Sequence, residues 1–598
     1  MKKILLVLII PLIIFSCKSN EYLVLQTKQE KENKTFHEGS LIIHDNYPIL
    51  TVKGTPYEAG LQYGVLLNRQ LVSMDNTVDS LLESYIGSLF IKKWITNIVL
   101  NAKIRRIEEK MSDNYIQEIN GMAKGSELSL KDLKIIAYFP QLFFKISCTS
   151  FIAKDVDRIV HGRNLDWPGI DAIASHPLIV NYNIEGKIPF TNLTFVGYPG
   201  VYTGMNHNGL SMSINMNGAP AENGNNIDDY NYEMPLAFKV RSILEEANNL
   251  NEVDDLFAAY SSHAWFITVG SKNDNSGAIY ELTRGELIKN EMKNDFLFVE
   301  NLSLSPKGRF AYSPIWMFAT SNMAREHKMK ELNKRYKGLN IIDKSYEILK
   351  NTEYYSYNKH PNYGYSINNY NTIKSCIMDN MNNEIYFSYG GGLAGCHKYL
   401  EYDINNNKIS EFRDKDTNCY DFEFTELKRL QSWYTKNYSN KKKLSKDDIN
   451  IISEKIKNYK INKGYKAYLL SKYYKQGEFY KDAKHYANIY IENYPKYFYP
   501  YYNKFVILKE NQEYEKASIV LKEMLQLETL SPYYKYKAWK ELIFVYKELD
   551  NNTKQFSTEI LSLYNKIDKY ISQYFIDERT TEELEEIKNI VENYKIEK

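Results

Sequence analysis

The chain has 598 residues, 43% of them hydrophobic and 25% charged, which is typical of a globular protein large enough for about two to four domains. Lys and Arg total 76 against 74 Asp and Glu, so the formal net charge is only +2. This balance gives no electrostatic basis for binding nucleic acid or an anionic membrane surface.

Residues 1–17, MKKILLVLIIPLIIFSC, have the pattern of an export signal. The apolar run from Ile4 to Phe15 is shorter than the roughly 20 residues that a membrane-spanning helix needs. Cys17 follows the small residue Ser16, which resembles a bacterial lipoprotein signal; the alternative is an ordinary cleaved signal with an incidental cysteine. We therefore predict an exported bacterial lipoprotein, anchored to a membrane through lipidated Cys17 on the periplasmic or surface side of the cell envelope.

The segment that follows the signal predicts a tether and then a mainly helical layer. Residues 18–36 are polar and suit a flexible connection. From 37 to 147 a short strand leads into apolar residues at helical spacing. Ser129, three residues before Asp132, is typical of a helix N-terminus.

From 148 to 412 the pattern changes to strands. Runs such as GLSMSINMNG and TIKSCIMDNMNNEIYFSYGG are joined by Asn, Gly and Asp turns. Helical stretches interrupt them near 230–250 and 321–351. This mixture predicts an antiparallel α+β domain.

A glycine pattern late in this domain imitates a dinucleotide site. Gly390, Gly392 and Gly395 have GxGxxG spacing after a strand. A dinucleotide site also needs a helix that begins at the third glycine, whereas the next residues, CHKYLEYDI, have the pattern of another strand. We interpret the glycines as a loop.

The last part of the chain, 425–598, is predicted to be entirely helical. Tyr480 and Tyr514, and likewise Ala483 and Ala517, are 34 residues apart, a period that resembles a tetratricopeptide repeat. The alternative is a generic helical bundle rich in tyrosine. Repeats of this kind carry no chemistry themselves, so we expect this tail to pack or to dock a protein partner.

The cysteines are too few for a disulfide scaffold in a chain of this length. There are five: Cys17, Cys148, Cys376, Cys396 and Cys419. The sequence holds no CxxC or HExxH motif, so we predict neither a metal site nor a cofactor. Cys396 and Cys419 could pair in an oxidising compartment, which the sequence does not decide.

Cys148 begins a run that predicts a β-hairpin. The midpoint of Cys148 and Arg163 falls between Asp155 and Val156, inside a polar stretch. A symmetric turn there would place Arg163 directly opposite Cys148, about 5 Å away at Cβ. Asp166 would then lie beside the main chain of the cysteine.

A cysteine nucleophile needs a base, because the thiolate is the reactive form. No spacing marks His161 or His263 as that base. Cutting the Ser147–Cys148 bond would give Cys148 an α-amino group with a pKa of about 7.7 to 8.0, which can take the thiol proton. The alternative is that Cys148 is a buried structural thiol and that Arg163 and Asp166 form an ordinary ion pair.

The motifs CTSF (148–151) and GRNLDW (162–167) resemble the nucleophile hairpin of the N-terminal-nucleophile amidases. This group includes choloylglycine hydrolase, acid ceramidase and isopenicillin N acyltransferase, and the similarity is closest to the last, the autoproteolytic acyltransferase/hydrolase family. GTPYEAGLQYG before the hairpin, and GMNHNGLSMSINMNG, TSNMAREHKMKELNKRY and SCIMDNMNNEIYFSYG after it, follow the order of that family. The resemblance covers about residues 48–400 and implies a four-layer αββα sandwich of antiparallel sheets.

The resemblance also implies roles for the hairpin residues. Cys148 would be the nucleophile and, after self-cleavage at Ser147–Cys148, the new N-terminus, while 37–147 would become a small subunit. Arg163 and Asp166 would orient the amine and the substrate.

Three further site residues are expected from the downstream motifs. Asn215 would donate a side-chain N–H to the oxyanion, and Asn322 would help to fix the cysteine amine and the acyl carbonyl. Arg335 in NKRY would be the remaining basic residue of the site. For each asparagine the alternative is a turn residue in an asparagine-rich chain.

These expectations favour a hydrolase that cleaves linear amides of small N-acyl molecules through an acyl-cysteine intermediate. Substrates in keeping with this are N-acyl amino acids, bile-salt-like conjugates, N-acyl lipids and small peptides. An acyltransferase would use the same intermediate, with an amine in place of water. Two other classes stay open: a catalytically silent, surface-anchored binding protein whose repeat tail recruits a partner, and a protein whose cleavage only matures an assembly.

Overall fold

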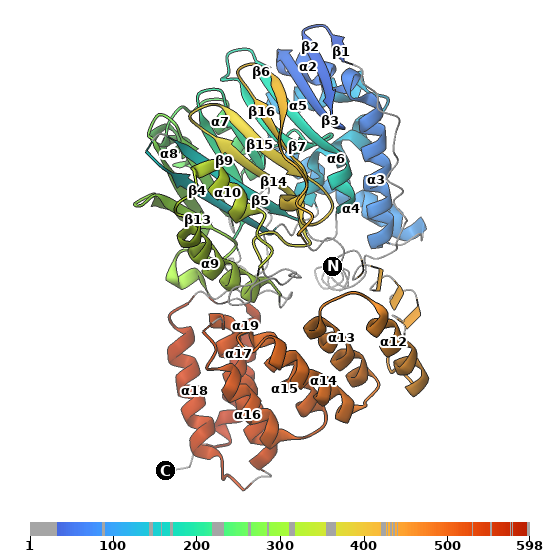
Figure 1. Cartoon of the computed structure of the whole chain (residues 1–598), viewed down its shortest axis with the longest axis vertical. Coiled ribbons are helices and arrows are strands. Elements are labelled where there is room, and N and C mark those ends of the chain that lie inside the picture. Colours follow the sequence, from blue (N-terminus) through green and yellow to red (C-terminus); the bar gives the residue numbers. More distant parts are fainter. Residues whose placement is uncertain are drawn as a thin grey trace.

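The structure is a computed structural model of the chain (Figure 1). It describes residues 33–86, 90–142, 147–156, 158–167, 171–217, 233–260, 265–283, 286–309, 317–353, 366–419, 426, 429–430, 433–434, 437–438, 441–528, 530–550, 553–574, 576 and 578–594. The predicted signal, its Cys17 and most of the tether lie outside these ranges. Among the helices within them, none is both long and apolar enough to cross a membrane.

The described part of the segment before Cys148 supplies three strands and a group of helices. The strands are β1 (Lys34–Phe36), β2 (Gly39–His44) and β3 (Tyr47–Gly54). The helices are α2 (Pro56–Leu66), α3 (Asn68–Ile86), α4 (Phe90–Glu108), α5 (Asp113–Gly125) and α6 (Leu130–Leu142).

Local sequence explains where these helices begin and how they pack. Thr55 caps α2, because its hydroxyl accepts a hydrogen bond from the Glu58 N–H while the Glu58 carboxylate accepts one from the Thr55 N–H. The predicted start at Ser129 is confirmed, since its hydroxyl accepts from the Asp132 N–H at 3.2 Å. Helices α2 and α5 cross closely at Gly60, where a Cβ would lie 2.0 Å from a main-chain carbonyl oxygen of α5.

The described strands form two sheets. The ten-stranded sheet has the order β1-β2-β3-β6-β7-β8-β9-β10-β11-β12, and the seven-stranded sheet has the order β13-β4-β5-β14-β15-β16-β17. Neighbouring strands are antiparallel except β3 and β6, which are parallel. The remaining strands are β4 (Ser147–Lys154), β5 (Ile159–Asp166), β6 (Pro177–Ile184), β7 (Phe190–Phe195), β8 (Thr203–Asn206), β9 (Leu210–Met216), β10 (Trp265–Ser271), β11 (Ser276–Thr283), β12 (Glu286–Glu291), β13 (Phe296–Val299), β14 (Thr372–Asp379), β15 (Glu384–Tyr389), β16 (Tyr399–Asp403) and β17 (Lys408–Arg413).

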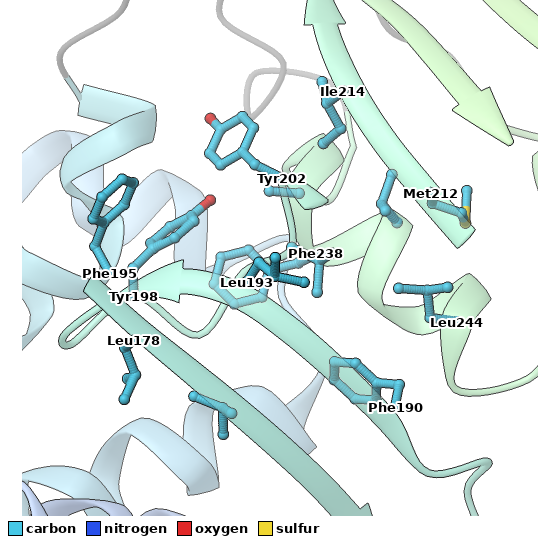
Figure 2. Packing of buried hydrophobic residues seen from close by; sticks show 14 of the residues in the cluster. Leu178, Phe190, Leu193, Phe195, Tyr198, Tyr202, Met212, Ile214, Phe238 and Leu244 are labelled. Atoms are coloured by element: carbon cyan, nitrogen blue, oxygen red, sulfur yellow. The ribbon is translucent and has the colours of Figure 1, made fainter. Parts of the chain in front are cut away.

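Helices cover the outer faces of both sheets, so the predicted αββα sandwich is confirmed. The outer face of the seven-stranded sheet packs against α9 (Met317–Arg335) and α10 (Ile341–Leu349). The ten-stranded sheet packs against α2, α7 (Leu236–Leu244) and α8 (Leu250–Phe257). Figure 2 shows part of this core, where residues of β6, β7 and β9 meet Phe238 and Leu244 of α7.

A buried ion-pair network joins the segment before Cys148 to the rest of the sandwich. Arg241 of α7 donates to Glu118 of α5 at 2.5 Å and to Glu245 at 2.9 Å. Its guanidinium also lies 4.3 Å from the ring centroid of Tyr182 and 4.8 Å from that of Tyr115. Because all three charged side chains are buried, breaking their pairing should lower the free energy of unfolding far more than breaking a surface pair.

The glycine-rich segment after β15 is a loop, as expected. It contains only a short 3₁₀ turn, Ala394–Cys396, before β16, and no helix begins at the third glycine. Cys396 also forms a disulfide with Cys419, with the two Cα atoms 6.1 Å apart. The pairing that the sequence left undecided is therefore present.

The described C-terminal region is helical, as predicted, and its geometry repeats. It comprises α12 (Lys446–Asn458), α13 (Lys463–Gln476), α14 (Tyr480–Asn493), α15 (Phe498–Glu510), α16 (Tyr514–Met524), α17 (Pro532–Asp550), α18 (Ser557–Ile571) and α19 (Glu578–Glu592).

Helices α14 and α16, which contain the residues 34 apart, begin in the same way. Tyr480 and Tyr514 are the first residues of α14 and α16, and both helices follow a residue of positive φ, Glu478 and Gln512. The tail also packs on the sandwich, because Ala324 of α9 belongs to the same buried cluster as residues of α12 and α13.

Candidate active site

Cys148 lies on β4 in the predicted hairpin, but the register differs by two residues from the predicted one. Cys148 is opposite Leu165, and Arg163 is opposite Ser150. The expectation that Arg163 would face Cys148 directly is therefore wrong.

The turn explains the shift. The Asp155 N–H donates to the Arg158 carbonyl at 3.0 Å, and the Asp155 carboxylate accepts from the Arg158 N–H at 2.8 Å, which centres the turn one residue later than predicted. Residues two apart on a strand share a face, so Arg163 still lies on the same face as Cys148. Its Nη2 donates to the Cys148 Sγ at 3.2 Å.

Arg163 also ties the hairpin to the opposite sheet. Nη2 donates to the Ile214 carbonyl at 2.7 Å, and Nη1 donates to the Tyr202 carbonyl and the Thr203 hydroxyl. Burial raises the pKa of the Cys148 thiol, and the nearby Arg163 cation opposes this only in part. The thiol is therefore protonated in the intact chain and needs a base to become a nucleophile.

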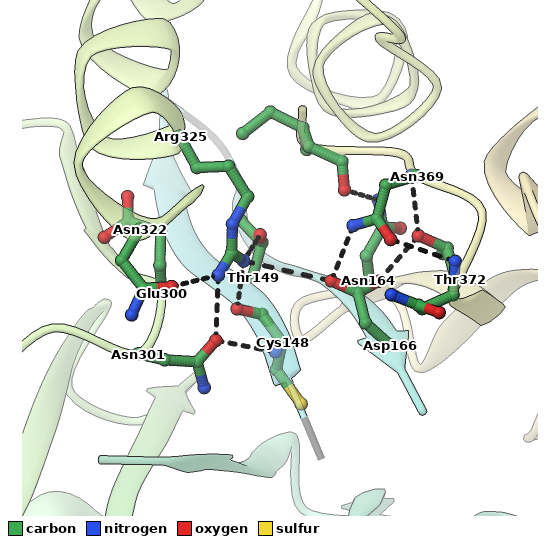
Figure 3. A network of polar contacts seen from close by, with 12 residues as sticks. Cys148, Thr149, Asn164, Asp166, Glu300, Asn301, Asn322, Arg325, Asn369 and Thr372 are labelled. Carbon is green, nitrogen blue, oxygen red and sulfur yellow. Dashed lines mark hydrogen bonds and ion pairs between the residues drawn. The ribbon is translucent and has the colours of Figure 1, made fainter. Parts of the chain in front are cut away.

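The main chain of Cys148 is held on both sides (Figure 3). Its N–H donates to the Asn301 side-chain oxygen at 3.0 Å, and its carbonyl accepts from Arg325 Nη1 at 2.6 Å. Arg325 Nη2 donates to the same Asn301 oxygen at 2.9 Å, and Nη1 donates to the Thr149 hydroxyl at 2.8 Å. Asn301 and Arg325 therefore fix the peptide unit on either side of the cysteine Cα.

Asp166 is the last residue of β5, and its side chain also lies near Arg325. Its carboxylate accepts from the Thr372 hydroxyl at 2.6 Å and from the Asn369 amide at 2.9 Å, and it lies 3.9 Å from Arg325 Nη1. Burial raises the pKa of Asp166 to about 6, against the lowering effect of Arg325. The predicted group of Cys148, Arg163 and Asp166 is thus brought together in one buried centre.

Comparisons with known proteins bear on the family of the chain. No family model matches the sequence. Over 191 residues the chain is 26% identical to the N-acylethanolamine-hydrolyzing acid amidase of Caenorhabditis elegans, covering 30% of this chain and 54% of that protein. Over 233 residues it is 24% identical to the acid ceramidase of Mus musculus, covering 35% of this chain and 57% of that protein. The chain is related to the N-terminal-nucleophile hydrolases.

The chain spans between a third and just over half of the length of the curated relatives it matches, 54%, 48% and 33% for three of them. Among solved structures, the C. elegans N-acylethanolamine-hydrolyzing acid amidase ortholog aligns over 39% of this chain and 93% of that one, at 23% identity and a TM-score of 0.29. The fold is therefore defined by the observed sheets and helices, and not by that alignment.

In this N-terminal-nucleophile fold, Asn215 lies between the sheets but does not offer its amide to the thiol. Its oxygen accepts from the Ser150 hydroxyl at 2.6 Å, and its Nδ2 donates to the carbonyls of Val299 at 3.2 Å and Glu300 at 3.0 Å. In the intact chain these bonds occupy its N–H groups. The oxyanion role expected for Asn215 would require them to be exchanged.

Asn322 and Arg335 do not contact Cys148. Asn322 instead accepts a hydrogen bond from Arg325 Nη2 at 2.5 Å. Arg335 is partly exposed and pairs with Glu331 and Glu353. It lies ten residues beyond Arg325 on α9, about 15 Å further along the helix axis.

The structure places Asn301 and Arg325 where Asn322 and Arg335 were expected. Asn301 lies two residues after the end of the edge strand β13, and Arg325 lies one helical turn after Asn322. The one signal in the sequence is that spacing of three residues on a helix, which puts Asn322 and Arg325 on the same face.

Proposed function

We propose that the protein is a self-activating cysteine amidase that hydrolyses linear amide bonds of N-acyl substrates through an acyl-cysteine intermediate. The observation that carries this proposal is the restraint of Cys148 at three atoms, with its nitrogen, carbonyl and sulfur each bound by a buried polar group. A structural thiol needs none of these contacts, because cysteine packs well as a small apolar residue.

Activation would proceed within the chain. The Cys148 sulfur attacks the carbonyl carbon of Ser147, the thiol proton passes to the peptide nitrogen, and the C–N bond breaks to leave a thioester and a free α-amine. Water then hydrolyses the thioester, which frees the thiol. Asn301 holds the departing nitrogen, and Arg325 fixes the carbonyl on the other side of the cysteine.

Amide hydrolysis would repeat this chemistry on the substrate. The α-amine takes the thiol proton and the sulfur attacks the substrate carbonyl. The resulting ammonium protonates the leaving amine, and water releases the acyl group. The carboxylate of Asp166 and the cation of Arg163 would orient the amine and stabilise the negative charge on sulfur.

The names of the relatives support hydrolysis of N-acyl amides. Two of them bear the names N-acylethanolamine-hydrolyzing acid amidase and acid ceramidase. The disulfide between Cys396 and Cys419 suits the oxidising compartment expected of an exported protein. Anchoring through Cys17 and docking of a protein partner by the helical tail are parts of the same proposal.

Intact mass and N-terminal sequencing test the activation step. The wild type should give two fragments, the second beginning at Cys148, whereas Cys148→Ala should stay one chain without amidase activity. Cys376→Ala removes the other buried free thiol of the described residues and should still be cut. A wild-type chain that stays uncut yet hydrolyses N-acyl amides would refute the N-terminal amine as the base, and a cut chain inactive on every N-acyl amide would refute the amidase.

A further inference from the structure

A row of four side chains leads away from Cys148 across the seven-stranded sheet. Cys148 of β4 is opposite Leu165 of β5, Leu165 is opposite Lys374 of β14, and Lys374 is opposite Tyr389 of β15. Adjacent strands lie about 4.8 Å apart, so the Lys374 Cα is about 10 Å from that of Cys148. Lys374 points toward the ten-stranded sheet, as Cys148 does, because its Nζ donates to the Leu193 carbonyl of β7.

The Lys374 ammonium is buried with too few acceptors. The side chain is 1% exposed, and its Nζ makes a single described hydrogen bond, 2.6 Å long, to Leu193. An ammonium carries three N–H donors, and no carboxylate among the described residues pairs with this one. Its other described neighbours are the rings of Phe195 and Tyr389, each with its centroid 5.9 Å from Nζ.

Two buried donors on residues near Lys374 lack a described partner. The Tyr389 hydroxyl and the Arg163 Nε have no hydrogen-bond acceptor among the described residues. Burial and the nearby Arg163 cation lower the pKa of Lys374 to about 7, as expected where no anion compensates the charge. Buried donors are rarely left unpaired in proteins, so we expect a bound ligand to supply the acceptor for these three side chains.

The charges of the centre favour the same conclusion. Arg163 and Arg325 are buried cations, Lys374 is a buried basic group, and the described ion pair of Asp166 in this centre is with Arg325, not with Lys374. Isolated buried charge is strongly unfavourable unless it is paired and hydrogen-bonded. An anionic group that entered beside Lys374 would supply both the charge and the acceptor oxygens.

We propose that Lys374, with Tyr389, binds a carboxylate of the substrate, so that the site prefers N-acyl amides carrying an acidic group. This inference rests on the proposed amidase function and narrows its substrate class. With the scissile carbonyl at Cys148, the carboxylate belongs either to the leaving amine, as in an N-acyl amino acid, or to the far end of a short dicarboxylic acyl group. An ethanolamide has a neutral hydroxyl at the corresponding place and would leave the ammonium unpaired.

Two matched substrate pairs distinguish these sources. N-palmitoylglycine against N-palmitoylethanolamine tests a carboxylate on the leaving amine, and the p-nitroanilides of adipic and hexanoic acid test one on the acyl group. The wild type should prefer the acidic member of one pair. Lys374→Met should lower the acidic-to-neutral ratio of kcat/KM by about 10- to 100-fold, mainly through KM, since hydrogen bonds between charged groups are the strong ones.

Tyr389→Phe keeps the ring and should lower the ratio less, by about 3- to 10-fold. The control is Lys272→Met, because Lys272 also donates to a main-chain carbonyl, that of Met381, but lies outside the row. It should leave the ratio as in the wild type.

The outcomes separate the two proposals. Hydrolysis of neither member of either pair overturns the amidase function itself. Hydrolysis of both members, with the same ratio in the wild type and in Lys374→Met, overturns only the role of Lys374. If Lys374→Met does not fold, Tyr389→Phe decides: a lowered ratio supports carboxylate binding, and an unchanged ratio refutes it.

Discussion

Asn301→Ala should slow the cut at Ser147–Cys148 severely while leaving the fold intact. The Asn301 oxygen accepts from the Cys148 N–H at 3.0 Å and from Arg325 Nη2 at 2.9 Å, and its Nδ2 donates to the Met216 carbonyl at 2.7 Å. Alanine removes all three bonds. The first two hold the nitrogen that must leave and the cation that fixes the cysteine carbonyl.

The size of the effect follows from these bonds. A bond to a charged group contributes about 1.5 to 3 kcal/mol and a neutral one about 0.5 to 1.5 kcal/mol. Loss of the two bonds at the reacting peptide unit should therefore raise the barrier by about 2 to 4 kcal/mol, which slows cutting about 30- to 1,000-fold. Asn322→Ala is the matched control, because Asn322 contacts Arg325 but not Cys148, and it should slow cutting less than about tenfold.

The assay follows the two fragments on a denaturing gel over time, with circular dichroism and thermal melting to establish that each variant is folded. A folded Asn301→Ala protein that is cut at the wild-type rate would refute the assignment of Asn301. So would an Asn322→Ala protein that is cut more slowly than Asn301→Ala.

Three further expectations concern stability. Arg241→Met should lower the free energy of unfolding by about 3 to 5 kcal/mol because it leaves buried glutamates unpaired, whereas Lys187→Met, at a partly exposed pair, should change it by less than about 1 kcal/mol; urea denaturation measures both. Asp166 has a native pKa of about 6 against an ordinary value of 3.8, so the folded state holds the extra proton and Asp166 should make wild-type stability fall as the pH rises from about 4 to 6; Asp166→Asn should make this slope shallower, and an identical pH profile would contradict the reasoning. Replacing both Cys396 and Cys419 by serine opens a link between residues 23 apart and should lower the free energy of unfolding by about 3 kcal/mol, which an unshifted melting temperature would contradict.

The parts of the site that the sequence predicted are those set by local pattern. Strand alternation places Cys148 and Arg163 on one face whether the register is the predicted one or the observed one, because the shift is an even number of residues. The exact pairing depended on how Asp155 closes the turn, and the prediction centred that turn one residue too early.

The residues that were missed come from elements distant in the sequence. Asn301 follows an edge strand and Arg325 lies on a covering helix, and only the packing of both against β4 brings them to Cys148. In a chain rich in asparagine and lysine, residue type alone cannot select among candidates. The predicted Arg335 lies ten residues beyond Arg325 on the same helix, about 15 Å further along, a distance that motif order does not resolve.

The parallel pairing of β3 with β6 has a consequence for how the protein folds and refolds. An incision ahead of Cys148 would split one continuous sheet between two polypeptides, so native structure has to be complete before the bond is broken. Once the cut product is denatured, regaining that sheet becomes a bimolecular encounter. Recovery after dilution from urea should then depend on protein concentration for the cut form and be independent of it for uncut Cys148→Ala.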